Sequence, residues 1–191
     1  MTRALVLVAA AAALLARPEV AHAHTPGRLR DGIPFVVEHP RDSYALFAVF
    51  ETGRERFIAE LVHERRFAAP VEVLVPHRDE LRDHRPAFAV VGPGLPAPTA
   101  EELATLPAPL PAGWGAVVEL NQVAPRPVIF ESIMRRFYWG SDPLAVVFPA
   151  GRSQIWVWSP HGTRGKFGLG FGVEEGGGYL AAFADWSLYA Y

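Results

Sequence analysis

Short apolar segments alternate with turn residues along most of the chain, and they set the first expectation for the fold. Their β-branched and aromatic content is typical of strands. Proline and glycine stand at their ends, where a missing backbone donor or a tight turn is tolerated. The segments cover residues 35–38, 44–52, 57–63, 71–76, 87–92, 115–120, 144–148, 155–158 and 166–173. This pattern predicts an all-β protein, a β-sandwich or jelly roll of short antiparallel strands.

The last predicted strand, 166–173, has the clearest alternation of side chains. Its apolar residues occupy every second position, which predicts one buried face. The positions between them hold Lys166 and a row of glycines. The period of two, with no helix after it, argues against a nucleotide-binding loop. The residues that point one way are Phe167, Leu169, Phe171 and Val173, and the first three are expected to form the buried face.

Two segments depart from the strand pattern. Residues 92–115 form a long connection in which Thr99 and Glu102 have the spacing of a capping box, which predicts a short helix. We expect this connection to cover the core. After a glycine-rich joint at 174–178, the apolar tail 179–191 is expected to be a docked helix, with a last strand as the alternative.

The first 23 residues have the organisation of a secretory signal peptide. A basic start precedes an apolar run, 4–16, that is too short to span a membrane, and Ala-His-Ala at 21–23 fits a cleavage site. Export places the mature chain outside the cytoplasm, in the periplasm or beyond. It is then expected to have a flexible N-terminus, 24–34, one sandwich domain, 35–173, and no membrane span.

Composition excludes several classes of function. The chain has no cysteine, which excludes a disulfide framework, a thiolate metal site and a cysteine nucleophile. The formal net charge is −2, and arginines are scattered among acidic residues. That mixture indicates surface ion pairs, and we expect no nucleic-acid partner. Lys166 is the only lysine.

Two stretches resemble a known type of domain. The first contains "DSYALFAVFETGRERFIAELVHER", "VEVLVP" and "PAFAVVGPGLP", and the second is "LAVVFPAGRSQIWVWSPHGTRGKFGLGFG". Residues 35–173, which contain both, are similar to the secreted β-sandwiches called bacterial pre-peptidase C-terminal domains, although no protease domain precedes them in this sequence. The resemblance implies an exported sandwich with a non-catalytic accessory or binding role.

Trp156 and Trp158 are the candidate ligand-binding residues. They share one face of their strand, opposite Ile155 and Val157. If the valine face is core, the two indoles either form an exposed platform for a ligand such as carbohydrate or pack beneath the 92–115 connection. The sequence leaves both arrangements open, and another extracytoplasmic protein is the alternative partner.

His24 is the candidate metal ligand, since signal cleavage would make it the first residue. An N-terminal amine and its imidazole can hold Cu(II), and one more imidazole completes the site. A periplasmic copper- or zinc-binding protein is therefore the alternative to a binding module, for which no cofactor is expected. The second imidazole would come from His39, His63, His77, His84 or His161.

A hydrolase is the third alternative. Two polar stretches partly resemble hydrolase motifs, but neither has the residues or the spacing that such a motif requires. In "HERRF", residues 63–67, Phe67 stands where a zinc protease needs its second histidine. In "SPHGT", residues 159–163, Ser159 and His161 are two apart in a turn, with nothing to orient the histidine. An enzyme is thus the less favoured class.

The stretch "HRDELRDHRP", residues 77–86, is the most polar link between two predicted strands. On a helical turn His77, Glu80 and His84 would share one face and could hold a divalent metal. Three arginines balance three acids here, however, so local ion pairs are expected instead. We expect an exposed connection without metal, in which alanine at all three positions costs no more than about 1 kcal/mol.

Overall fold

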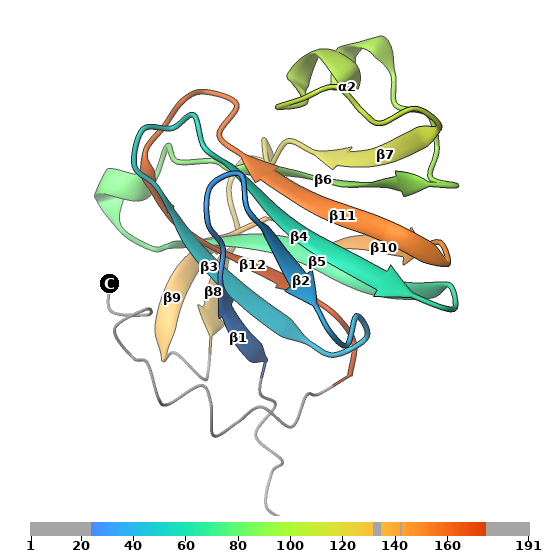
Figure 1. Cartoon of the computed structure of the whole chain (residues 1–191). Helices are drawn as coiled ribbons and strands as arrows, with labels where there is room; N and C mark the ends of the chain where they lie inside the picture. The colour runs from blue at the N-terminus through green and yellow to red at the C-terminus, as the bar shows by residue number, and fades with distance from the viewer. Residues whose placement is uncertain (1–23, 132–134, 142, 175–191) are drawn as a thin grey trace, which may run out of the picture.

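Two β-sheets stack face to face in a computed structural model, which describes residues 24–131, 135–141 and 143–174 (Figure 1). The β-sandwich predicted from the sequence is confirmed. The signal peptide, 1–23, and the tail beyond Glu174 lie outside the described residues, so the expectations for both stay predictions.

The larger sheet has seven strands in the order β1-β3-β12-β5-β9-β8, with β10 pairing β5 off this path. The smaller sheet has five, in the order β2-β4-β11-β6-β7. No helix among the described residues is long and apolar enough to cross a membrane. The elements are β1 (Thr25–Arg28), β2 (Pro34–Val37), β3 (Tyr44–Phe50), β4 (Arg56–His63), β5 (Phe67–Pro76), the 3-10 turn η1 (Asp79–Leu81), β6 (Ala87–Pro93), α2 (Ala100–Thr105), β7 (Trp114–Glu119), β8 (Val128–Glu131), β9 (Arg136–Gly140), β10 (Leu144–Phe148), β11 (Gly151–Trp158) and β12 (Gly165–Phe171).

The segment expected to be a flexible N-terminus, 24–34, instead joins both sheets. β1 pairs in parallel with β3, and β2 pairs in parallel with β4, so two edge pairs are not antiparallel. Between them Leu29 is 2% exposed and anchors the crossing from one sheet to the other. The sequence pattern missed β1 because Pro26 and Gly27, the two central residues of this four-residue strand, have low strand propensity.

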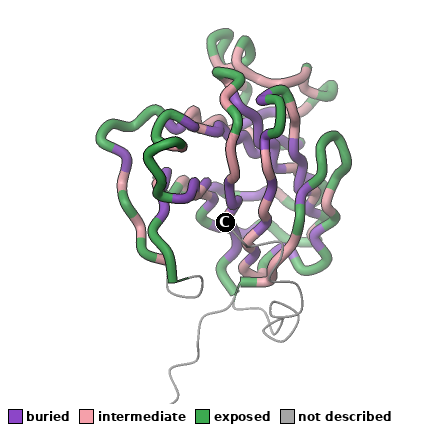
Figure 2. Tube along the Cα trace, turned by 90° about the vertical axis from the view of Figure 1, so that its left-hand side faces the viewer, coloured by how far each residue is buried: buried purple, intermediate pink, exposed green. Residues whose placement is uncertain are grey.

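The interior lies between the two sheets, where buried positions gather (Figure 2). Phe167, Leu169 and Phe171 are buried in it, as their alternation predicts. Val173 is not, and its side chain is 49% exposed. The reason is that β12 ends at Phe171 and the chain turns at Gly172, whose φ is +106°. A side chain there would be strained.

A second, smaller core lies on the outer face of the five-stranded sheet. Leu106 and Leu110, from the long connection, pack against it. α2 begins with the predicted capping box: the Thr99 hydroxyl accepts from the Glu102 N–H at 3.1 Å, and the Glu102 carboxylate accepts from the Thr99 N–H at 2.7 Å. The expected helix and its covering role are confirmed.

The β8–β9 hairpin is a second part of the fold that the sequence pattern did not predict. Its strands pair antiparallel, with Phe130 opposite Phe137. Both rings are more than half exposed, whereas Tyr138, next to Phe137, is 2% exposed. Apolar side chains therefore lie on both faces of the hairpin, and the alternation of apolar and polar residues that predicts a strand is missing.

Candidate ligand-binding site

The outward-facing residues of the central strands of the seven-stranded sheet are half-buried or buried, and the centre of this outer face is shaped by the glycine row of β12. A Cβ on Gly168 would come within 3.2 Å of Phe47, and a Cβ on Gly170 within 3.2 Å of Glu72. The glycines therefore leave room for these two side chains to lean over β12. Burial in this position raises the pKa of the Glu72 carboxyl above its usual range.

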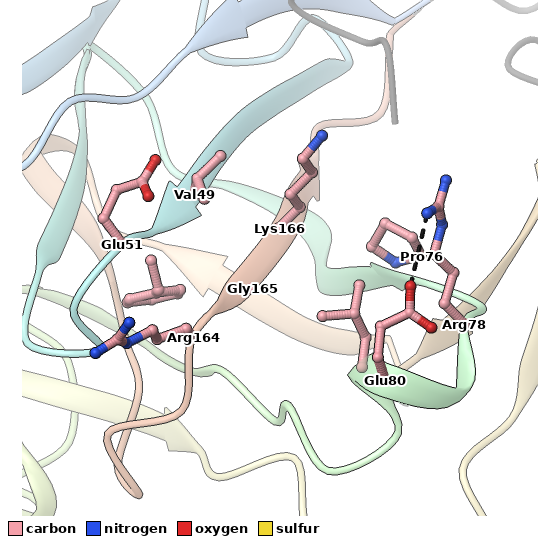
Figure 3. Close-up of a pocket in the computed structure, with 10 residues that line it drawn as sticks. Val49, Glu51, Pro76, Arg78, Glu80, Arg164, Gly165 and Lys166 are labelled. Carbon is pink, nitrogen blue, oxygen red and sulfur yellow. Dashed lines mark ion pairs between the residues drawn. The ribbon is translucent and has the colours of Figure 1, made fainter.

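At one end of this face the surface is hollowed into a pocket of about 380 Å³ (Figure 3). Three segments build it: the end of β3, the end of β5 with the link and η1 that follow it, and the start of β12. Such a mixture of apolar and charged side chains is usual where proteins hold small ligands or partner side chains. The lining residues are Val49, Phe50, Glu51, Pro76, Arg78, Glu80, Leu81, Arg164, Gly165 and Lys166.

Cations outnumber acids among the charged residues of the pocket, three to two. One pair is formed inside it, between Arg78 and Glu80 at 3.6 Å, and both side chains are largely exposed. Such a pair contributes roughly 0–1 kcal/mol, so solvent or a ligand can replace it. No carboxylate of residues 24–131, 135–141 or 143–174 lies within salt-bridge distance of Arg164.

Gly165 lets the pocket wall close against a buried histidine. Its φ is +155°, and a Cβ there would lie 2.7 Å from the His84 ring and 2.8 Å from the Leu81 side chain. Both neighbours would have to move for any larger residue. Only glycine at position 165 allows the pocket wall to lie this close to Leu81 and His84.

His84 lies behind that wall and is 2% exposed. Its Nδ1 atom is 2.9 Å from the Thr163 hydroxyl, which is 3.0 Å from the Ser159 hydroxyl. The ring also meets Phe50 edge-on, at 5.5 Å between centroids. Burial, together with the nearby charge of Arg126, lowers the pKa of His84 to about 4. The imidazole is therefore neutral near pH 7.

Arg126 holds the backbone of the 77–86 link in place through hydrogen bonds. Its guanidinium donates to the backbone carbonyls of Arg82, His84 and Trp139, at 3.3, 3.0 and 3.3 Å. Arg126 is only 7% exposed, and its burial lowers its pKa to about 10. A buried guanidinium with carbonyl partners is costly to disturb, so the link that carries η1 is held in place.

The stretch "HRDELRDHRP" is therefore mostly, but not wholly, the exposed connection expected from its charges. Asp79 pairs with Arg82 at 3.0 Å, as local ion pairs three residues apart should. His77 and Glu80 are exposed, but His84 is buried. The expectation that the whole link is exposed is wrong for His84. We now expect alanine at His84 to cost more than about 1 kcal/mol, because a buried ring and its hydrogen bond would be lost.

Trp156 and Trp158 are each 4% exposed and belong to the second core. The connection above them supplies Trp114 and its leucines, which is the covering arrangement of the two that the sequence left open. The Trp156 indole N–H donates to Gln154 at 2.8 Å, beside β11 itself. In this conformation neither ring is open to stack on a ligand.

His24 lies at the start of β1, where its Nδ1 contacts the Ser43 hydroxyl. Among the described residues, no group of three or more His, Cys, Asp or Glu side chains is placed to hold a metal ion. The histidines proposed as second ligands are separated: His63 contacts Ser153, His77 stacks on Trp139, and His84 is buried elsewhere. The structure does not bring any of these three to His24.

The stretches weighed as catalytic motifs have structural roles. "HERRF" spans the turn between β4 and β5, so His63 and Phe67 are not on one helix. Ser159 is linked through Thr163 to His84, not paired with His161. A neutral, buried imidazole with a depressed pKa is a weak base, and its charged neighbour, Arg126, is a cation where a triad has a carboxylate.

Sequence reasoning missed the pocket because its parts are far apart in the chain. Val49, Leu81 and Lys166 come from three separate segments and meet only through the pairing of β12 with β3 and β5. One signal was available: Lys166 is the only lysine, and it stands on the polar side of the best-defined strand.

Comparison with known proteins adds little. No protein-family description matches the chain, and no curated protein is similar to it. One solved structure that resembles it is the pre-peptidase C-terminal domain of collagenase from Bacillus anthracis, with a TM-score of 0.38 and 7% identity over 78% of this chain and 96% of that one. This is the type of domain that the sequence resembles, but at this TM-score the likeness carries no argument about function.

Proposed function

We propose that the protein is an extracytoplasmic, non-catalytic binding module that holds part of a partner molecule in the pocket between β3, η1 and β12. The observation that carries this proposal is the pocket itself. It joins four apolar side chains to five charged ones at one end of a sheet face. The link that forms one wall is fixed by the buried Arg126, so the site is formed before any ligand arrives.

As the partner, another extracytoplasmic protein or peptide is favoured over carbohydrate. Neutral sugars are commonly held by exposed aromatic rings, and the two indoles that could serve are buried beneath the long connection. Charged side chains around an apolar depression instead suit a peptide, which offers both apolar and ionic groups.

The binding role is tested by filling the pocket. Val49 is half-buried on β3 and lines it, whereas Val147, 50% exposed on β10, lies outside it. Peptides selected from a random library on the parent protein should bind Val49→Trp at least about tenfold more weakly and Val147→Trp unchanged. Equal binding to all three proteins, or no selected peptide at all, would overturn the proposal.

The extracytoplasmic location is tested separately, by mass spectrometry of the protein from its native host. The signal-peptide pattern predicts that the mature chain begins at His24. Protein that retains Met1 throughout the cell would contradict export and leave the pocket proposal untouched.

A further inference from the structure

We infer that the free edge of β8 is a strand-addition site, which accepts an extended segment of a partner protein with apolar side chains at alternate positions. This inference goes beyond the proposed function, because β8 lies outside the pocket. β8 is the last strand at one edge of the seven-stranded sheet (Figure 1), and among the described residues it pairs only with β9. Its other edge can therefore accept one more strand.

The backbone of β8 points its hydrogen-bonding groups outward at the two residues that also have exposed side chains. The Pro127 carbonyl accepts a hydrogen bond from β9 at 2.9 Å. Because these groups alternate in direction along an antiparallel strand, those of Val128 and Phe130 point away from β9. The Phe137 carbonyl, opposite Phe130, likewise points away from β8 and accepts from the His77 N–H at 3.0 Å. Val128 and Phe130 thus each offer one donor and one acceptor at the free edge.

One face of the hairpin supplies apolar contacts beside that edge. Val128 lies opposite Trp139 and Phe130 opposite Phe137, so these side chains share a face. Val128, Phe130 and Phe137 are 49%, 54% and 57% exposed, and the centroids of the two phenylalanine rings are 5.0 Å apart. A strand added to β8 would place every second side chain against Val128 and Phe130.

Three other edges of the sandwich are less suited to pairing. Proline lies within two of the edge strands, Pro26 in β1 and Pro34 at the start of β2. On β7 the N–H of Ala116 already donates to the Pro96 carbonyl of the long connection, at 2.9 Å. Natural sheets use prolines and covering loops to prevent strand addition, whereas residues 128–130 of β8 read Val-Ile-Phe.

The size of the apolar surface favours a single strand over a second copy of the whole chain. A fully buried aromatic side chain covers roughly 150–250 Å², so each half-exposed phenylalanine ring offers about 100 Å². With Val128 the surface amounts to about 300 Å², well below the roughly 800 Å² per partner of a stable complex. A peptide strand gains its remaining affinity from main-chain hydrogen bonds, which need little side-chain area.

Modified peptides can separate strand addition from general apolar adhesion. The probe is a fluorescein-labelled peptide of seven residues in which valine and phenylalanine alternate with threonine. Two further versions carry N-methyl groups, one on the apolar residues and the other on the threonines. Each version loses the donors along one edge of the peptide only, because successive N–H groups of a strand point to opposite sides. Binding to the full mature chain is measured by fluorescence anisotropy.

The unmethylated peptide is expected to bind in a saturable manner at roughly submillimolar concentrations, as for a small, transient interface. One methylated version should bind at least about tenfold more weakly than the other, whichever way the added strand runs. Phe130→Ser should weaken binding of the unmethylated peptide at least about fivefold. Two control variants should leave it unchanged: Val147→Ser on β10, where the side chain is 50% exposed, and Val49→Trp in the pocket.

Three results would overturn the inference. Equal binding of the two methylated versions would mean that the peptide adheres without main-chain pairing. No binding to the parent, or equal binding to Phe130→Ser, would remove the peptide from β8. A dimer of the parent in sedimentation that is lost in Phe130→Ser would assign the edge to a second copy of the chain. The peptide selection on the pocket is unaffected by all three, so the proposed function is decided separately.

Discussion

The two sheets of the sandwich treat their outer faces in opposite ways. On the five-stranded sheet, Trp156 and Trp158 are covered by the chain's own long connection. On the seven-stranded sheet, the outward positions of β12 are Lys166 and two glycines, and the surface is hollowed at one end. On the five-stranded sheet, the large aromatic side chains of β11 lie on a face whose packing contributes to folding. On the seven-stranded sheet, the small and charged side chains of β12 lie on the face that we propose binds a ligand.

The largest expected effect is on the covered face. Trp156→Ala should lower the free energy of unfolding by about 3–5 kcal/mol, because the ring is buried between β11 and the connection. Urea denaturation would measure it. A loss below about 1 kcal/mol would mean that the connection is not packed on the indoles, and the contrast between the two faces would fail.

The next effect concerns His84, which separates the open pocket from the interior. The unfolded chain takes up this proton near the ordinary pKa of 6.5, and the folded protein only near 4. Stability from the neutral ring is therefore fully present above pH 6.5 and is lost as the pH falls towards 4, by an amount on the order of 3 kcal/mol.

Unfolding measured across this pH range should be flatter for His84→Gln, which keeps a neutral group that can bond to Thr163. His77→Gln is the matched control from the same stretch, since His77 is exposed. If the two variants follow the same pH dependence as the parent protein, the burial of His84 does not control acid stability.

The smallest expected effect on stability is on the face that holds the pocket. Lys166→Gln should change the free energy of unfolding by less than about 1 kcal/mol, because a half-buried surface cation contributes little. The same variant should lose most of its affinity for a peptide selected on the parent. A large loss of stability would assign Lys166 to the fold and not to binding.

The architecture was predictable because the alternation of apolar and polar residues follows the burial of one strand face, and turn residues show where strands end. Phe167, Leu169 and Phe171 alternate and are buried, and Thr99 with Glu102 predicted the helix start. What could not be predicted depended on distant contacts. His84 is buried because Gly165, far along the chain, has no side chain to displace it.

The candidate site was less predictable than the fold for the same reason. The aromatic pair stood out in the sequence, but whether the connection covered it or left it open depended on packing that no local pattern encodes. The pocket residues, in contrast, are ordinary surface types in three separate segments. Only the sheet register brings Val49, Pro76 and Lys166 to one place.

The most direct test of the contrast between the faces is a crystal of the protein soaked in a mixture of small aromatic acids, amides and alcohols. We expect fragment density in the pocket, against Leu81, Gly165 and Lys166, with the connection still covering Trp156 and Trp158. Fragments stacked on either indole, with the connection displaced and the pocket empty, would contradict the assignment of binding to the face that holds the pocket.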